Sequence, residues 1–70
     1  MNLNETLRKI GLNITTIRKQ QGLTSNELGY MCDIDKSSLI HIEKGRTNVT
    51  LKTLHKIAQA LSVDVIDFLK

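Results

Sequence analysis

The sequence contains no proline and no tryptophan, and it has one cysteine, four glycines and only two aromatic residues. Proline breaks helices and is common in turns, so its absence favours a chain built from continuous helices. β-Branched residues do not alternate with polar ones over any useful length. The single cysteine excludes an internal disulfide, and no set of residues has the spacing of metal ligands. The sequence therefore predicts an all-α fold that needs no metal and no cofactor.

Seventy residues predict a single small domain, residues 1–70. A core of this size rarely supplies more than about 3–5 kcal/mol of net stability, so we expect support from a second subunit. The longest apolar run is far shorter than the roughly 18 residues of a membrane span, and no secretory leader opens the chain. We therefore expect a cytoplasmic protein with no membrane contact. The net charge of +3 suits a polyanionic partner but is weak evidence by itself.

Residues 2–21 predict a first helix, because their apolar residues, spaced three and four apart, form one stripe: Leu3, Leu7, Ile10, Ile14 and Ile17. Gly22 ends this helix. Gly11 lies inside it and costs roughly 1 kcal/mol relative to alanine, so we expect the helix to bend or to start afresh there. Leu12 lies off the stripe. It is either an isolated exposed leucine or, with Leu3 or Leu7, part of a self-association surface.

Residues 24–45 predict two short helices joined by a tight turn. Thr24 and Glu27 have the spacing of a capping box, in which each side chain accepts a hydrogen bond from the other residue's backbone N–H. The first helix then presents one apolar face, which we expect to be buried: Leu28, Met31 and Cys32.

Asp33 stands where this first short helix must end, and aspartate tolerates the left-handed backbone conformation better than most residues. Asp35 is expected to cap the second short helix, and Gly45 to end it. Its neighbouring apolar residues are Ile34, Leu39 and Ile42. The connection between the two helices is too short for a loop, so they must cross steeply, as in a helix-turn-helix.

Residues 46–49 form a polar loop, after which Thr50 is expected to cap a fourth helix. Its expected inward residues are Leu51, Leu54, Ile57, Ala58 and Leu61. Asp64 caps a short last helix, with Asp67 as the reciprocal acid and with Phe68 and Leu69 as anchors. The sequence thus predicts a compact bundle of five helices.

The sequence resembles the phage-repressor-like (XRE, or Cro/repressor) helix-turn-helix family from about Gly11 to Leu69. The matching pieces are Ile14-x-x-Ile17-Arg18, Gly22-Leu23-Thr24, Glu27-Leu28-Gly29, Ile34, Leu39-x-x-Ile42-Glu43-x-Gly45, Asn48 and Leu54-x-x-Ile57-Ala58-x-x-Leu61-x-Val63. The resemblance implies a lambda-repressor-like fold and binding to double-stranded DNA. The first ten residues precede it and read as a helical extension.

A helix fits the major groove of DNA, and its N-terminal residues reach base edges. The resemblance implies four base-reading residues on the second helix of the motif: Lys36, Ser37, Ile40 and His41. Free backbone N–H groups at helix ends attract phosphates. The phosphate-binding candidates are therefore Thr24, Ser25 and Asn26 at the start of the motif's first helix, and Lys44, Arg46, Thr47 and Asn48 at the end of its second helix and in the loop that follows.

Three further features follow from the resemblance. Arg18 and Glu43 are implied to form an ion pair that ties the first helix to the recognition helix. Gly29 stands where the family carries a small residue, because the two helices of the motif cross closely there. Ser25 departs from the family, many of whose members carry a glutamine that bridges a phosphate and the recognition helix. Serine is too short to do both.

The sequence gives no sign of catalysis. His41 and His55 are far apart and have no acid or nucleophile at a catalytic spacing. The turn and the cap already account for Asp33 and Asp35, and Cys32 reads as a small buried hydrophobe. No phosphate-binding glycine-rich loop is present, and no small-molecule substrate is evident.

The function we expect is a sequence-specific transcriptional regulator that binds a palindromic operator as a homodimer and regulates its own gene. A phage-type repressor, a restriction–modification controller and an antitoxin-like regulator all fit. The dimer interface is expected on the last helix, at Val65, Ile66 and Leu69, with Leu12 as a second possibility. The alternative is a protein-interaction module of the same fold, such as an antirepressor or antitoxin core, that does not bind specific DNA.

Overall fold

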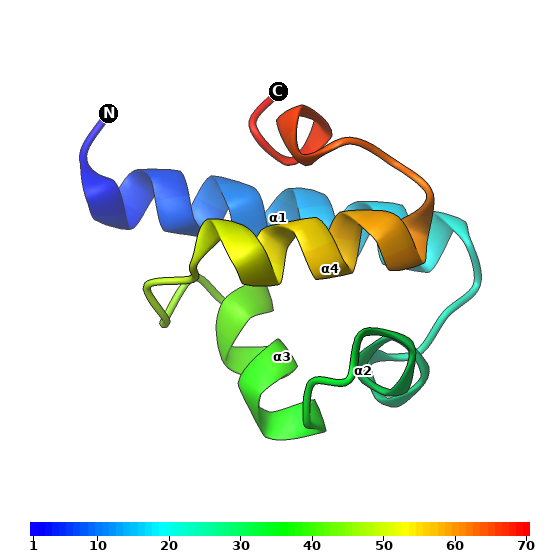
Figure 1. Ribbon diagram of the computed structural model, residues 1–70. Coiled ribbons are helices and arrows are strands. Elements are labelled where there is room, and N and C mark those ends of the chain that lie inside the picture. The colour runs from blue at the N-terminus through cyan, green and yellow to red at the C-terminus, as the bar shows by residue number, and fades with distance from the viewer.

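The computed structural model describes residues 1–70 and contains four α-helices and a final short 3-10 helix. They are α1 (Leu3–Gln20), α2 (Ser25–Cys32), α3 (Lys36–Glu43), α4 (Leu51–Leu61) and η1 (Val65–Phe68). Helices α1 and α4 lie side by side and begin at the same end of the molecule (Figure 1). Helices α2 and α3 pack below them, and η1 packs above. The predicted all-α fold with a helix-turn-helix is confirmed, except that the last element is a 3-10 turn.

Local capping signals start most of the helices. Glu27 N–H donates to Thr24 Oγ1 at 3.0 Å and Thr24 N–H donates to Glu27 Oε1 at 2.9 Å, so the predicted capping box is confirmed. Thr50 Oγ1 accepts from Thr53 N–H at 3.2 Å, as expected for the cap of α4. A capping box at Asn2 and Glu5 also starts α1. Its spacing was visible in the sequence, but we did not predict it.

Asp35 stands at the N-cap of α3 with an extended backbone, yet its side chain makes no cap hydrogen bond. The predicted position of the cap is therefore confirmed, although the carboxylate does not accept a cap hydrogen bond. The Ser38 hydroxyl and amide are still close enough to lower the pKa of Asp35. The carboxylate thus remains ionised at the positive end of the helix, where a negative charge is favourable.

Each α-helix ends at a residue in the left-handed conformation. These residues are Gly22 (φ +72°), Asp33 (φ +59°), Gly45 (φ +70°) and Ser62 (φ +58°). After α3, Arg46 N–H donates to His41 O at 2.9 Å and Gly45 N–H donates to Ile42 O at 3.1 Å. This is a Schellman motif, which turns the chain sharply away from the helix. The predicted roles of Asp33 and Gly45 are therefore confirmed.

The core is formed by one apolar face of each helix and by Phe68, which is fully buried. Its residues include Ile14, Leu28, Cys32, Leu39, Ile42, Leu54, Ile57, Ala58 and Leu61. Gln21 Nε2 donates to Leu61 O at 2.7 Å and Asn13 Nδ2 donates to Phe68 O at 2.8 Å. The first hydrogen bond joins the residue at the end of α1 to the end of α4, and the second joins α1 to η1.

Four apolar residues that we expected to pack inward are exposed. The exposed fraction is 59% for Leu3, 51% for Met31, 69% for Leu51 and 48% for Leu69. Helical spacing predicts on which face of a helix a side chain lies. It does not predict along how much of that face neighbouring helices pack. Leu3 and Leu51 lie in the first turns of α1 and α4, at the end where no other helix covers them (Figure 1). Met31 lies on α2 beyond the edge of the core.

Gly11 neither bends nor restarts α1, which is one helix from Leu3 to Gln20. A Cβ at Gly11 would come within 2.5 Å of Ile42 O and closer still to Glu43 O, both backbone atoms. A Cβ at Gly45 would meet the Cα of Arg8 at 2.7 Å. Gly11 and Gly45 therefore allow the C-terminal end of α3 to lie directly on α1.

We predict that Gly11→Ala destabilises the protein by about 1–3 kcal/mol, because the new methyl group would displace the backbone of α3. Helix propensity alone predicts the opposite sign, since alanine is favoured over glycine by roughly 1 kcal/mol. Thermal unfolding followed by circular dichroism would measure the change. Thr16→Ala, at an exposed site of α1, is the matched control and should leave the melting temperature nearly unchanged. A melting temperature raised by Gly11→Ala would contradict the close packing of α3 on α1.

Candidate nucleic-acid interface

A buried ion pair holds the recognition helix α3 against α1. Arg18 Nε donates to Glu43 Oε2 at 2.6 Å and Arg18 Nη2 donates to Glu43 Oε1 at 3.2 Å. The two side chains are only 9% and 8% exposed. Arg18 Nη1 also donates to Leu23 O at 2.8 Å, in the connection between α1 and α2. The Arg18 guanidinium therefore makes structural contacts within the protein, and it is too buried to reach a phosphate.

The same ion pair reaches the start of α2. The Ser25 hydroxyl donates to Glu43 Oε1 at 3.4 Å, a long hydrogen bond that joins α2 to the end of α3. A Cβ at Gly29 would lie 2.6 Å from Ile34 O, in the turn between these helices. The two helices of the motif therefore cross with no room for a larger side chain at Gly29, as the resemblance implied.

The outward face of α3 is accessible over its whole length. Lys36, Ser37, His41 and Lys44 are exposed, whereas Ile40 is half-buried. On the opposite face of the helix, Leu39 is fully buried and Ile42 is 5% exposed. The core thus fixes which side of α3 points outward, and the four predicted base-reading residues lie on that side.

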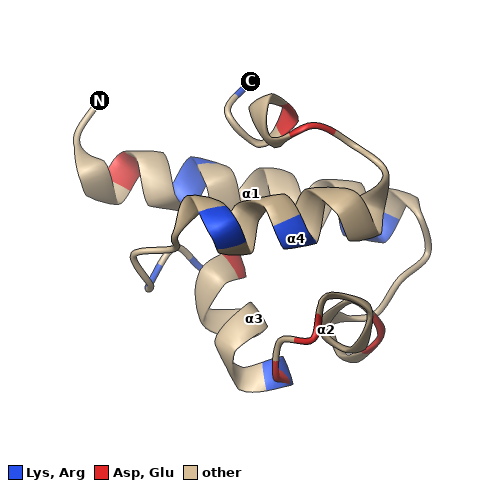
Figure 2. Ribbon diagram, viewed as in Figure 1, with Lys and Arg blue, Asp and Glu red and all other residues tan.

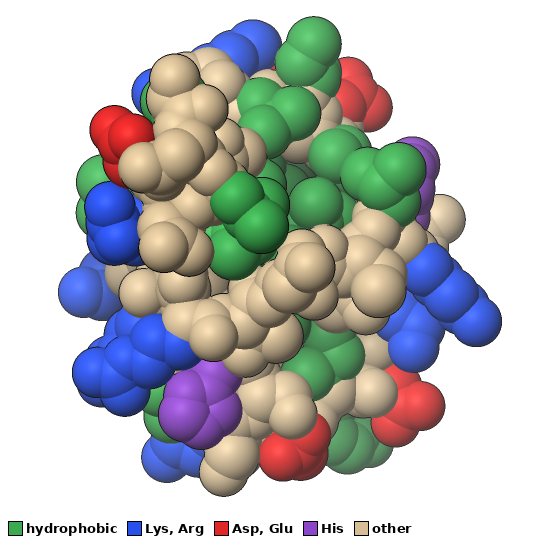
Figure 3. All heavy atoms as spheres, turned by 90° about the vertical axis from the view of Figure 1, so that its left-hand side faces the viewer, with side chains coloured by type: hydrophobic (Ala, Val, Ile, Leu, Met, Phe, Trp, Pro, Cys, Tyr) green, Lys and Arg blue, Asp and Glu red, His purple; other side chains and the backbone are tan.

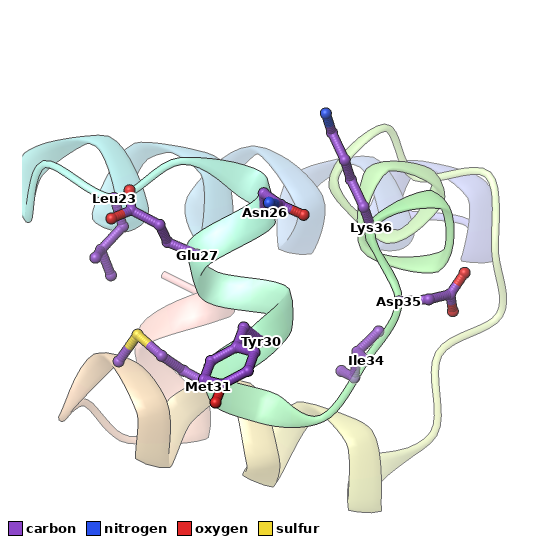
Figure 4. Close-up of a pocket in the computed structure, with 8 residues that line it drawn as sticks. All are labelled: Leu23, Asn26, Glu27, Tyr30, Met31, Ile34, Asp35 and Lys36. Carbon is purple, nitrogen blue, oxygen red and sulfur yellow. The ribbon is translucent and has the colours of Figure 1, made fainter.

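Two surface hollows connect this face to the start of α2. One has a volume of about 480 Å³ and is lined by Ser25, Ile40 and Lys44 together with Arg18 and Glu43. The other is lined by Asn26 and Lys36, and also by the acids Glu27 and Asp35. In Figure 4 both Asn26 and Lys36 lie on the upper side of the motif, and the Lys36 side chain points away from α4. Residues from both helices therefore share one surface.

The remaining phosphate candidates are spread more widely. Thr24 is exposed but its oxygen already accepts the cap hydrogen bond from Glu27. Arg46 is exposed in the loop after α3. Thr47 and Asn48 line a different hollow, beside Ser38 and Thr53. These two residues are thus separated from the hollow that contains Ser25 and Lys44.

The charges around α3 are mostly positive. Lys36, Lys44 and Arg46 lie on or next to the helix, and Figure 2 shows basic residues at both of its ends. Glu43 lines the hollow near Ser25, but Arg18 neutralises its charge. In Figure 4 the Asp35 carboxylate points to the side and Lys36 points upward. A phosphate approaching the outward face of α3 therefore meets positive charge.

Sequence reasoning missed a contribution of α1 to this surface. Leu12, which is 63% exposed, and Thr15 line the same hollow as Ser25 and Ile40. The place of Leu12 off the apolar stripe was the one signal available. Its direction relative to α3 could not be known without the packing of the helices.

The other candidate residues lie outside this surface. Ile66 is 62% exposed, whereas Val65 is half-buried against the core. Cys32 is buried, and burial raises the pKa of its thiol, which makes it a poor nucleophile. The structure contains no group of three or more His, Cys, Asp or Glu residues able to hold a metal ion. None of the helices has both the length and the apolar character that a membrane span requires.

The fold and the exposed second helix define a helix-turn-helix protein. The helix-turn-helix family model HTH_3 matches residues 14–68, and the chain belongs to this family of transcriptional regulators. It is 34% identical over 58 residues to the HTH-type transcriptional regulator y4dJ of Sinorhizobium fredii, covering 83% of this chain and 75% of that protein. It is 32% identical over 62 residues to the control protein C.BamHI of Bacillus amyloliquefaciens, covering 83% of this chain and 76% of that protein.

A phage protein and a solved structure agree with this assignment. The immunity repressor of Bacillus phage phi105 is 38% identical over 56 residues, which span 80% of this chain and 39% of the repressor. The crystal structure of the restriction-modification controller protein C.AhdI from Aeromonas hydrophila superposes with a TM-score of 0.91 at 26% identity. It covers 97% of this chain and 99% of the controller chain. The family and these relatives are transcriptional regulators, not enzymes.

We predict that Glu43→Ala destabilises the protein by about 3–5 kcal/mol, because it leaves the Arg18 guanidinium buried without its anion. The double variant Arg18→Met/Glu43→Leu should recover much of this loss, since it removes both charges and keeps the volume. Chemical denaturation of the two variants and of the unaltered protein would measure both effects. If Glu43→Ala were as stable as the unaltered protein, the ion pair would not be what holds α3 to α1.

Proposed function

We propose that this protein binds a specific double-stranded DNA operator as a homodimer and regulates transcription, including that of its own gene. The outward face of α3 enters the major groove, where Lys36, Ser37, Ile40 and His41 read base edges. Phosphates are bound by residues at the ends of α2 and α3: Thr24, Ser25, Asn26, Lys44, Arg46, Thr47 and Asn48. Such a regulator works where the DNA is, so we expect it in the cytoplasm.

One observation carries this proposal: α3 presents an exposed, basic face and is fixed from behind by a buried ion pair. Basic side chains around an open helix favour a polyanion such as DNA over the alternative of an interaction module. The relatives named as controller proteins and as an immunity repressor support a role in the control of transcription. We further propose that Leu12 and Thr15 contact the DNA backbone beside Ser25.

Dimerisation is supported by apolar residues that the protomer leaves exposed. We propose an interface at Val65, Ile66 and Leu69, extended by Leu3 and Leu51. Figure 3 shows hydrophobic side chains gathered over the upper part of the end of the molecule at which α1 and α4 begin. A protomer of 30 × 22 × 20 Å allows a symmetric dimer to place two recognition helices about 34 Å apart, one turn of the DNA helix.

The proposal is tested by comparing binding to DNA from the protein's own promoter region with binding to random DNA of equal length, near physiological salt. We expect a preference of roughly a thousandfold or more and a footprint with two-fold symmetry. Weak, equal binding to both, followed by no enrichment of any fragment from the whole genome, would refute specific DNA binding and favour an interaction module.

We predict different effects for two basic residues. Lys36→Ala should reduce the preference for the operator by about 1–3 kcal/mol, because a base contact is lost. Arg46→Ala should weaken binding to all sequences and lower the salt-dependence slope by about one, because a phosphate contact is lost. Fluorescence anisotropy over a range of salt concentrations would separate the two effects. Lys52→Ala on α4 is the control with the same charge change, and unaltered binding by all three variants would show that DNA docks elsewhere.

We predict that the double variant Ile66→Asp/Leu69→Asp is monomeric, because it places charges in the proposed interface. Its affinity for a palindromic site should fall by about a hundredfold or more, while its affinity for a half-site stays the same, since only the linkage between two half-sites is lost. Light scattering after size-exclusion chromatography would give the oligomeric state. Tyr30→Asp, at an exposed residue of α2, should remain dimeric. A dimeric double variant would rule out this interface.

A further inference from the structure

The C-terminal end of α3 lies against the N-terminal half of α1, at a basic residue that none of the contacts described so far involves. A Cβ at Gly45 would come within 2.7 Å of the Cα of Arg8 and within 2.8 Å of its Cγ. The Arg8 side chain is nevertheless exposed. Its base is therefore held at the end of α3, while its guanidinium can reach a ligand in the solvent.

Arg8 is one of three cations at this point of the molecule. Lys44 and Arg46 flank Gly45 in the chain, and both are exposed. Neither of the two ion pairs of the structure involves any of these three residues. The Glu5 carboxylate, on the preceding turn of α1, accepts a hydrogen bond from the backbone N–H of the N-cap residue at 3.2 Å. Three cations without an acidic partner favour a polyanionic ligand.

The position of Arg8 along α1 places it on the side of the candidate DNA surface. Leu12 and Thr15 follow Arg8 by four and seven residues, so the three residues share one face of the helix. Leu12 and Thr15 line the hollow that also contains Lys44. Arg8 thus extends this surface by one helical turn toward the start of α1.

The same part of α1 adjoins the apolar side chains of the proposed dimer interface. Leu3 precedes Arg8 by five residues, which corresponds to about 7.5 Å along the helix axis. Figure 3 shows Lys and Arg side chains along one edge of the end of the molecule at which α1 and α4 begin, beside the hydrophobic side chains. In a dimer formed through these hydrophobic side chains, the two Arg8 residues lie close to the two-fold axis.

We propose that Arg8 binds a backbone phosphate near the centre of the operator, between the two half-sites. A guanidinium donates to phosphate oxygens, often through two N–H groups at once. The two-fold axis of a dimer passes through the centre of its operator, so a residue beside this axis meets the DNA there. The central position rests on the proposed function, whereas phosphate binding by Arg8 rests on its place on α1 and on the three unpaired cations.

The proposal is tested with Arg8→Gln, which removes the charge but keeps the methylene groups that lie against Gly45. Binding to the operator and to random DNA should weaken by the same factor, about three- to tenfold near physiological salt. The salt-dependence slope should fall by about one, because one phosphate contact is lost. Arg8→Lys keeps the charge and should keep the slope. Fluorescence anisotropy over a range of salt concentrations measures both quantities.

Lys9→Gln is the matched control, because it makes the same charge change at the next residue. Lys9 precedes Asn13 by four residues, and the Asn13 side chain donates to Phe68 O, so Lys9 lies on the face of α1 that meets η1. This variant should keep the affinity within about twofold and leave the slope unchanged. Equal weakening by both variants, or an unchanged slope in Arg8→Gln, would overturn the proposal. Circular dichroism of each variant confirms that it is folded.

Ethylation interference locates the contact on the DNA. Ethylation of one phosphate on each strand between the half-sites should weaken binding of the unaltered protein and should have no further effect on Arg8→Gln. If the interference lost in Arg8→Gln lay outside the half-sites, the central position would be wrong. If the unaltered protein preferred no DNA, the proposed function and the central position would both be refuted. A lower slope on random DNA in Arg8→Gln, but not in Lys9→Gln, would then still establish phosphate binding by Arg8.

Discussion

The ion pair between Arg18 and Glu43 is the contact on which the arrangement of the recognition helix depends. It joins α1 to the end of α3, and its remaining hydrogen bonds reach the α1–α2 connection and Ser25 of α2. A buried guanidinium is tolerated only when its N–H groups have partners, so these segments must all be in place together. Three elements are thereby fixed by one pair of side chains.

Close backbone packing makes the ion pair possible. The absence of a side chain at Gly11 lets the last carbonyls of α3 approach α1, and Gly29 does the same for the turn between α2 and α3. Helix α3 has only eight residues and would not be stable in isolation. Its order comes from the core, through Leu39 and Ile42, and from this packing. A rigid helix is what a site for base contacts needs, because a misplaced donor loses its hydrogen bond.

The helix-turn-helix carries charges of both signs. The outward face of α3 is basic, while Glu27, Asp33 and Asp35 lie on α2 and in the turn that follows it. Glu27 completes the capping box of α2 and Asp33 takes the left-handed conformation that ends this helix, so local structure sets the positions of these two acids.

The sequence by itself determined the helices, most of their caps, the steep turn and the inward face of the motif. These features depend on residues only a few positions apart: Thr24 with Glu27, Thr50 with Thr53, and the spacing of Leu39 and Ile42. Only the tertiary structure decided that Leu3, Met31, Leu51 and Leu69 are exposed, that Gly11 lies beneath α3, and that Leu12 lies beside Ser25. Burial depends on which helix covers which, and that is set by contacts between segments far apart in the chain.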